Sequence, residues 1–150
     1  MTFRHVPVER FPRELCRLVV SNVRFVLFVQ VETSGRDVPA PAFSFDSLNL
    51  GKVLTRNVEF NNYSKPTPVQ QYSIPISMAG RDIMACAQTG SGKTAAFTFP
   101  VLYCLLKKGQ PSNNGRRAMP SALALAPTRE LAIQIQEESS KFSFRCGLRT

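Results

Sequence analysis

The sequence predicts an α/β fold, with a parallel sheet flanked by helices, and three observations support this prediction. Compact apolar runs at 81–87 (RDIMACA) and 122–126 (ALALA) suit strands buried inside a parallel sheet. A segment with helical features follows each run, at 93–108 and at 130–142. A glycine-rich loop separates the first run from the first of these helices. Strand, loop, helix, loop, strand and helix in this order form the beginning of an open α/β sheet.

The first 41 residues form a separate, atypical segment to which the sequence assigns no function. Polar residues interrupt its apolar stretch at 15–32, which falls short of the roughly 18 apolar residues of a membrane span. The β-branched run at 23–31 predicts one strand, and turn-forming residues at 33–41 mark the boundary. Because no membrane or targeting signal is evident, we expect a protein of the cytoplasm, with the nucleus as a second compartment.

Two further helices are predicted between the boundary and the glycine-rich loop. In residues 50–60, the side chains of Leu50, Leu54 and Val58 fall on one helical face. After a break at 61–68, a second, short helix begins near Val69. The second helix leads to the run at 81–87, so the order of elements stays compatible with an α/β fold.

The charge of the chain points to a polyanionic partner. Among its 150 residues, 19 are Lys or Arg and 10 are Asp or Glu, a net charge of +9. Residues 42–150 hold 13 of the basic and 6 of the acidic residues. Such an excess is compatible with binding nucleic acid, but on charge alone a solvated basic face is the favoured account. The four cysteines are widely spaced and the chain has one histidine, so no zinc ligand set is predicted.

The residues AQTGSGKT, from Ala87 to Thr94, predict a loop that holds a polyphosphate. Gly90 and Gly92 let the backbone turn successive N–H groups inward. Lys93 adds a positive charge, and the Thr94 hydroxyl is a ligand for Mg²⁺. The N-terminus of the following helix presents its dipole to the same anion. The alternative is a glycine-rich turn that leads into a helix.

The stretch at 63–70 (YSKPTPVQ) has two interpretations that the residues alone leave even. In the structural one, Thr67 is the N-cap of a helix, Pro68 its first residue and Gln70 the partner of a capping box. In the functional one, the Gln70 amide recognises the edge of an adenine on which Tyr63 stacks.

Four features in order resemble the DEAD-box ATP-dependent RNA helicases. These are Phe45, PTPVQ (66–70), ACAQTGSGKTAAF (85–97) and ALAPTREL (124–131), which match the upstream aromatic, the Q motif, motif I and motif Ia. The wording is most similar to the Vasa- and Belle-like subgroup, with Asn62 where that subgroup often has Arg. The resemblance implies that residues 42–150 are the N-terminal part of a RecA-like (P-loop NTPase) domain, with the Q motif region at about 43–71.

The resemblance also implies an ATP and Mg²⁺ site and a contact with single-stranded RNA. In the ATP site, the first four residues surround adenine and the others hold the phosphates, with Thr94 on Mg²⁺: Phe45, Tyr63, Lys65, Gln70, Ala87, Gln88, Thr89, Gly90, Ser91, Gly92, Lys93 and Thr94. Pro127, Thr128 and Arg129 contact the RNA sugar–phosphate backbone, with little sequence specificity. The alternative for Thr128 is simple N-capping of the helix at 130–142, with Glu130 in its first turn.

The chain contains no aspartate after Lys93; its three aspartates are Asp37, Asp46 and Asp82. Phosphoryl transfer in this class normally needs such a carboxylate near Mg²⁺. We therefore expect these 150 residues to be inactive as an ATPase, although the family is enzymatic. They correspond to an incomplete first RecA-like domain, and we expect residues 42–150 to be marginally stable. The alternatives are a non-catalytic nucleotide- or RNA-binding fragment and a gene-model fragment.

Overall fold

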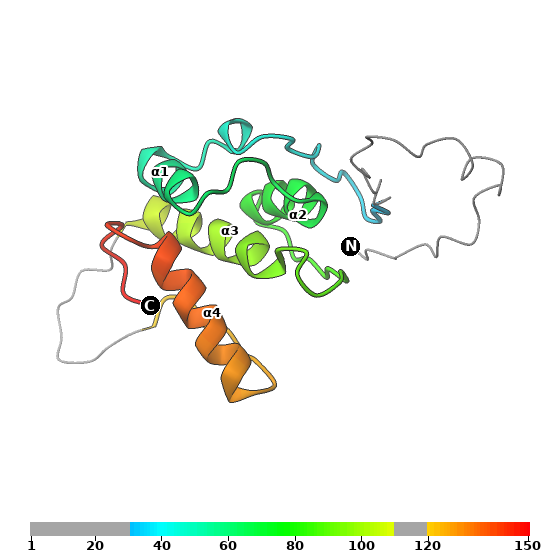
Figure 1. The fold of residues 1–150 in the computed structure, drawn as a ribbon. Helices are drawn as coiled ribbons and strands as arrows, with labels where there is room; N and C mark the ends of the chain where they lie inside the picture. The colour runs from blue at the N-terminus through cyan, green and yellow to red at the C-terminus, as the bar shows by residue number, and fades with distance from the viewer. Residues whose placement is uncertain (1–30, 110–119) are drawn as a thin grey trace, which may run out of the picture.

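The structure, a computed structural model, describes residues 31–109 and 120–150, and these are helical wherever they are regular (Figure 1). The strand predicted at 23–31 lies outside the described residues except for its last position. One 3₁₀ helix and four α-helices follow one another along the described chain: η3 (Asp46–Leu48), α1 (Lys52–Phe60), α2 (Pro68–Met78), α3 (Lys93–Lys108) and α4 (Arg129–Phe142). The helices predicted from the sequence are confirmed.

The parallel sheet predicted from the sequence is not confirmed. Residues 81–87 and 122–126 have no regular secondary structure, and no strand is present among the described residues. In the second run, the side chains of Leu123 and Leu125 are 81% and 85% exposed. A parallel strand needs a neighbour for its backbone and covering layers on both faces. The two runs do not pair with each other, so apolar composition alone did not make them strands.

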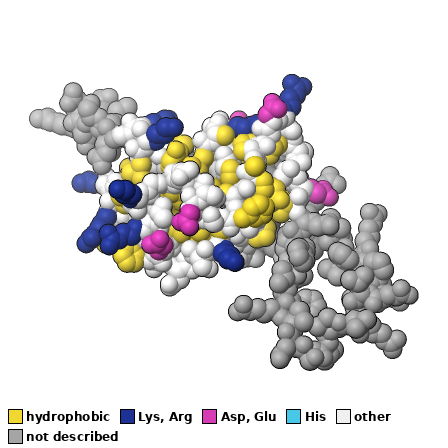
Figure 2. Space-filling model, turned by 90° about the horizontal axis from the view of Figure 1, so that it is seen from above, with side chains coloured by type: hydrophobic (Ala, Val, Ile, Leu, Met, Phe, Trp, Pro, Cys, Tyr) yellow, Lys and Arg dark blue, Asp and Glu magenta, His cyan; other side chains and the backbone are white. Residues whose placement is uncertain are grey.

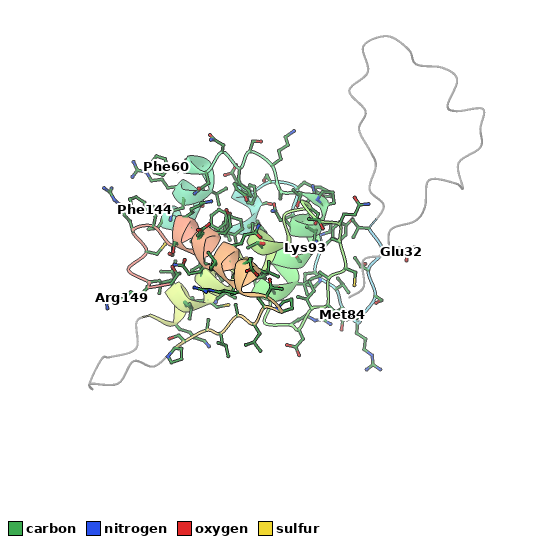
Figure 3. The ribbon with its side chains drawn as sticks, turned by 60° about the horizontal axis from the view of Figure 1, so that its bottom comes forward. Glu32, Phe60, Met84, Lys93, Phe144 and Arg149 are labelled. Atoms are coloured by element: carbon green, nitrogen blue, oxygen red, sulfur yellow. The ribbon has the colours of Figure 1, made fainter. Side chains whose placement is uncertain are left out.

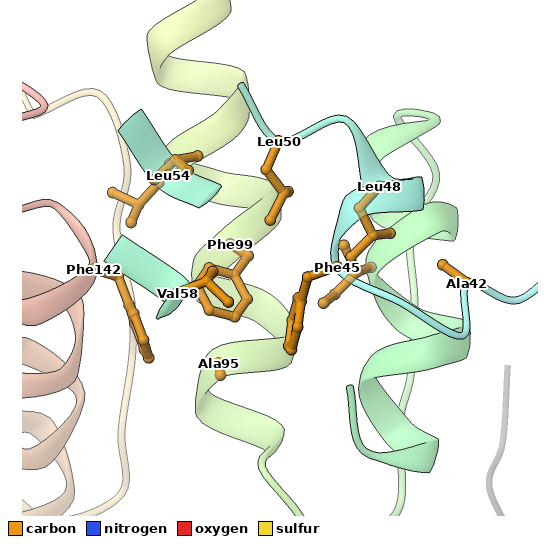
Figure 4. Close-up of a cluster of buried hydrophobic side chains, with 11 residues drawn as sticks. Ala42, Phe45, Leu48, Leu50, Leu54, Val58, Ala95, Phe99 and Phe142 are labelled. Atoms are coloured by element: carbon orange, nitrogen blue, oxygen red, sulfur yellow. The ribbon is translucent and has the colours of Figure 1, made fainter. Parts of the chain in front are cut away.

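The hydrophobic core forms around α3, whose Phe99 is completely buried (Figure 4). α3 packs against both α2 and α4. Four aromatic rings meet edge to face or tilted, with centroids 4.5–6.2 Å apart, an arrangement that aromatic quadrupoles favour. These rings belong to Phe45, Tyr63, Phe99 and Phe142. The core therefore joins residues from before α1 to the end of α4.

Two sets of polar contacts fix the outer segments to this core. The backbone N–H of Ala42 donates to the carbonyl of Gln71, 2.9 Å away, which holds the segment before η3 against α2. The buried Asn57 of α1 donates through Nδ2 to the carbonyls of Phe142 and Phe144, each at 2.7 Å. These bonds join α1 to the turn that follows α4.

In the described residues, no helix combines the length and the apolar character needed to span a membrane.

Candidate nucleotide-binding site

The glycine-rich loop lies directly before α3, and its two glycines adopt left-handed backbone conformations. Gly90 has φ +80°, and Gly92, the residue before the helix, has φ +87°. Side chains with a Cβ rarely adopt these angles, so the glycines permit the turn that aims the loop at the helix N-terminus. Lys93 and Thr94 then form the first turn of α3, where both are partly exposed (Figure 3 labels Lys93).

Gly92 has a second constraint, because α2 approaches it closely. A Cβ built on Gly92 would overlap Nε2 of Gln70 and lie 3.2 Å from Oγ1 of Thr67. A Cβ on Gly90 would meet nothing within 4 Å. The two glycines thus share a backbone conformation but differ in their surroundings. Only at Gly92 does the site require the space that a missing side chain leaves.

Hydrogen bonds join the start of α2 to the loop. Thr67 donates through Oγ1 to the carbonyl of Ser91 at 2.7 Å. Gln70 donates through Nε2 to the carbonyl of Gly92 at 3.1 Å. These carbonyls lie in the last two residues before α3, so the segment at 67–70 sets the position of the loop at the helix N-terminus.

The structural interpretation of 63–70 is confirmed. Thr67 is the N-cap of α2, Pro68 is its first residue, and Oε1 of Gln70 accepts a hydrogen bond from the Thr67 backbone N–H at 3.0 Å. Gln70 is completely buried. An amide has two donor hydrogens and two acceptor lone pairs, so one of each remains beyond the two bonds described. Recognition of adenine by Gln70 stays a prediction.

The Lys93 ammonium lies over the loop. Its Nζ donates to the carbonyls of Ala87 and Gln88, each at 2.6 Å. These bonds hold the charge beside the loop backbone and leave a third N–H for an anion. The buried Oγ of Ser91 has no hydrogen-bond partner within the described chain. A buried hydroxyl without a partner is costly, and an oxygen-rich ligand would satisfy it.

These features fit a polyphosphate and its magnesium ion. The loop combines two left-handed glycines, an unpartnered hydroxyl, an ammonium and the N-terminus of a 16-residue helix. Thr94 would supply its hydroxyl oxygen to Mg²⁺, an ion that keeps several waters and phosphate oxygens as ligands. When bound, the ion would neutralise phosphate charge. No group of three or more His, Cys, Asp or Glu side chains gathers within the described residues.

The aromatic residues predicted near adenine lie in the core. Phe45 is 5% exposed, and its ring centroid is 6.2 Å from that of Tyr63 and 5.9 Å from that of Phe99. Tyr63 also packs on Phe142, at 5.4 Å. Burial, assisted by the Glu138 carboxylate, raises the pKa of the Tyr63 phenol. Both rings are therefore part of the core packing, in addition to any contact with adenine. The third predicted adenine neighbour, Lys65, is exposed to solvent.

The predicted RNA contact, residues 127–129, is exposed at the start of α4. Oγ1 of Thr128 accepts a hydrogen bond from the Leu131 backbone N–H at 3.3 Å, and Glu130 lies in the first turn. The N-cap interpretation of Thr128 is therefore confirmed. The Thr128 hydroxyl proton and the Arg129 guanidinium are still available as donors, so the RNA contact stays a prediction.

The bond between Thr67 and Ser91 was missed by sequence reasoning. The partners are 24 residues apart, and both patterns were recognised separately, one as a helix cap and the other as a loop. The small residue at 92 was a usable signal, because glycine beside a helix start often marks a close approach.

Several known proteins are similar to this chain in sequence or in structure. The family profile described as DEAD/DEAH box helicase matches residues 67–150, which contain both the start of α2 and the loop. The chain is 55% identical over 129 residues to DEAD-box ATP-dependent RNA helicase 52A of Oryza sativa subsp. japonica, covering 81% of this chain and 21% of that protein.

Two solved structures are similar as well. The RNA-helicase Prp28 from Chaetomium thermophilum, bound to ADP, aligns with a TM-score of 0.68 and 38% identity, covering 77% of this chain and 28% of Prp28. The S. cerevisiae dbp5 structure with gle1 and ip6 aligns with a TM-score of 0.61 and 33% identity, covering 71% of this chain and 26% of dbp5.

The fold of this chain is of the RecA-like helicase-domain class, as its structural neighbours and matching family profile indicate. The chain belongs to the DEAD/DEAH box helicase family. It spans between about a fifth and somewhat more than a quarter of the length of these relatives.

Proposed function

We propose that this chain carries the nucleotide-holding and first RNA-contacting parts of an ATP-dependent RNA helicase. The observation that carries the proposal is the pair of hydrogen bonds from Thr67 and Gln70 to the carbonyls of Ser91 and Gly92. They unite the two sequence patterns predicted to hold ATP in one structural unit. Prp28, a structural relative, was solved with ADP, which agrees with nucleotide binding in this class.

In this site, each part of the loop has a distinct task. Lys93 pairs with the phosphates, the amides at the start of α3 face them, and Thr94 contributes to the Mg²⁺ shell. Gln70 is buried in this structure, and its remaining donor and acceptor would have to become accessible to adenine when ATP binds. Tyr63, Phe45 and Lys65 would complete that side of the site. Because Phe45 and Tyr63 pack in the core, they would support the adenine side of the site as well as contact the base.

Pro127, Thr128 and Arg129 bind the sugar–phosphate backbone of single-stranded RNA. Their support is the exposed N-terminus of α4, which offers backbone N–H groups, a hydroxyl and a guanidinium at one place. The wording of the sequence motifs supports membership of the Vasa- and Belle-like subgroup.

Nucleotide titration tests the proposed site. We expect Lys93→Ala to weaken binding of MgATP at least about tenfold, since a charged hydrogen bond to phosphate contributes about 1.5–3 kcal/mol. Lys108→Ala, a change of the same charge at the far end of α3, serves as the control. Equal MgATP affinity of the two variants contradicts the assignment.

As a second candidate, we propose that residues 1–150 taken by themselves bind nucleotide and RNA without hydrolysing ATP. Within these residues, no aspartate follows Lys93 to support the Mg²⁺ shell. RNA-stimulated phosphate release should be at background for the 150-residue chain and measurable for a family member that has the downstream motifs. Release by the short chain at a rate typical of intact helicases would favour the enzymatic function for this polypeptide itself.

A further inference from the structure

A second surface, at the opposite end of α4 from Thr128, is shallowly hollowed and is lined by basic and aromatic side chains. It lies between α1 and the turn after α4 and consists of two adjacent hollows, of about 380 and 290 Å³. Three residues line both hollows: Asn57, Phe60 and Phe144. The larger volume is at the lower end of the range of small-ligand pockets, ~300–1,000 Å³, and the smaller volume falls just below that range. We call this surface the α1 groove.

The charged side chains that line the α1 groove are all basic. Lys52, Arg56 and Arg145 line the larger hollow, and Lys141 lines the smaller one. No carboxylate among the described residues lines either hollow, although Glu138 pairs with Lys141 at 2.6 Å just outside. Figure 2 shows Lys and Arg side chains beside hydrophobic ones toward the left of the molecule seen from above, with Asp or Glu side chains close by.

Two exposed aromatic rings accompany these cations. Phe60 and Phe144 are 67% and 56% exposed, unusual values for phenylalanine, and both lie on the same side of the molecule (Figure 3). The guanidinium of Arg56 lies 5.6 Å from the centre of the Phe60 ring, and that of Arg145 lies 5.4 Å from the centre of the Phe144 ring. Each Arg–Phe pair thus places a positive charge beside a flat apolar surface.

The groove is held in place by the buried interior. Asn57 sits between the hollows and bonds to the carbonyls of Phe142 and Phe144. Arg145 follows in a left-handed conformation, with φ +56°. The turn that carries one ring and one cation is therefore fixed relative to α1, which carries the others. A preorganised surface loses less entropy on binding than a flexible one.

We propose that the α1 groove binds single-stranded RNA, separately from residues 127–129. A single strand presents phosphates and flat bases together, which match cations and exposed rings better than an acidic peptide does. α4 separates the two sites by about 20 Å, at 1.5 Å per residue. That the strand is RNA rests on the proposed function. That the groove binds a single-stranded nucleic acid rests on the cations and exposed rings of the groove itself.

The charge contribution is tested by Arg56→Gln combined with Arg145→Asn in the 150-residue chain. Asn is chosen at 145 because it tolerates the left-handed conformation. The probe is fluorescein-labelled oligouridine of about 10 nucleotides. We expect about tenfold weaker binding and a salt slope smaller by about 1.4, or ~0.7 for each lost phosphate contact. Lys107→Gln with Lys108→Gln removes the same charge at the end of α3 and should leave the affinity within about twofold.

The ring contribution is tested by Phe60→Leu combined with Phe144→Leu. This change retains apolar side chains but removes the flat surfaces, so we expect about tenfold weaker binding at an unchanged salt slope. Both rings are exposed, and far-UV circular dichroism should match that of the parent chain.

The outcomes separate this inference from the proposed function. If the groove variants bind oligouridine as tightly as the charge control, the inference is wrong. If these variants instead lose affinity for an acidic peptide, the groove is a protein-binding surface. If Arg129→Ala alone abolishes RNA binding, the groove fails and the proposed function stands. If MgATP does not bind but the groove variants still lose RNA affinity, the nucleotide assignment fails and the groove stands.

Discussion

Gln70 connects the two sequence patterns of the site at the scale of single residues. Its oxygen caps α2 and its nitrogen holds the carbonyl of Gly92, so one buried side chain serves both a helix start and a loop. A buried amide that lost these partners would leave unpaired backbone groups on both segments. The same contact explains why a Cβ at position 92 would overlap the Gln70 amide.

Gly92→Ala should damage the site more than Gly90→Ala. Both changes place a Cβ at positive φ, which costs about 1–2 kcal/mol. Only the Cβ at 92 overlaps Gln70, and overpacking adds about 1–3 kcal/mol. We expect the larger loss for Gly92→Ala in both urea-unfolding free energy and MgATP affinity. Equal losses in the two variants would show that α2 does not constrain the loop.

Tyr63 makes stability depend on pH in the alkaline range. Burial, and secondly the Glu138 carboxylate, raise its pKa above the ordinary value of 10.0. The unfolded chain then releases the phenolic proton first, so this contribution is complete below about pH 10 and is lost as the pH rises through the folded pKa. Unfolding free energies measured by urea at about pH 9 and 11 should therefore fall less for Tyr63→Phe than for the parent chain. Identical falls would contradict this role.

At the scale of elements, the helix ends show how much the sequence could predict. The Thr67–Gln70 cap was predictable because its hydrogen bonds are local. The end of α1 uses local bonds too: the N–H of Asn62 donates to the carbonyl of Glu59, and that of Tyr63 donates to the carbonyl of Val58. This is a Schellman motif, with Asn62 at φ +60°.

Asn62 is therefore explained by its left-handed backbone conformation, at a position where the Vasa- and Belle-like subgroup often has Arg. We expect Asn62→Gly to leave the unfolding free energy unchanged or slightly higher, because glycine favours the left-handed position. Asn62→Val should lower it by about 1–2 kcal/mol. Urea unfolding measures both, and a neutral valine substitution would rule out the motif as a stabilising element.

The non-local parts of the fold and site were beyond the sequence. ALALA at 122–126 has the composition of a buried strand, but strand formation depends on partners that composition does not specify. Phe45 and Tyr63 were assigned to adenine from motif positions, yet both pack in a core whose members are far apart in sequence. The exposed rings at Phe60 and Phe144 carried no motif signal and needed the structure to bring them together.

At the scale of the whole molecule, much apolar surface is open to solvent. α4 buries only Phe142, while Ile133 is 46% exposed, and Met84, Leu123 and Leu125 are more exposed still. Burial of apolar surface stabilises a fold by about 25 cal/mol per Å². The apolar area that stays in water here does not contribute this stabilisation. The core around Phe99 therefore leaves these apolar side chains without covering layers.

We accordingly expect low stability for the 150-residue chain. Thermal unfolding should be broad, and the dye ANS should bind to the native state because apolar surface is exposed. Circular dichroism and ANS fluorescence measure these properties. A sharp cooperative transition together with strong amide protection in the core would contradict the expectation.

The central claim is that the start of α2 and the glycine-rich loop form one unit that holds an adenine nucleotide. Amide hydrogen exchange, with and without MgATP, tests it most directly. We predict that residues 67–71 and 90–96 gain protection together when MgATP is added. Protection of neither segment, or of the loop without the start of α2, would contradict the claim.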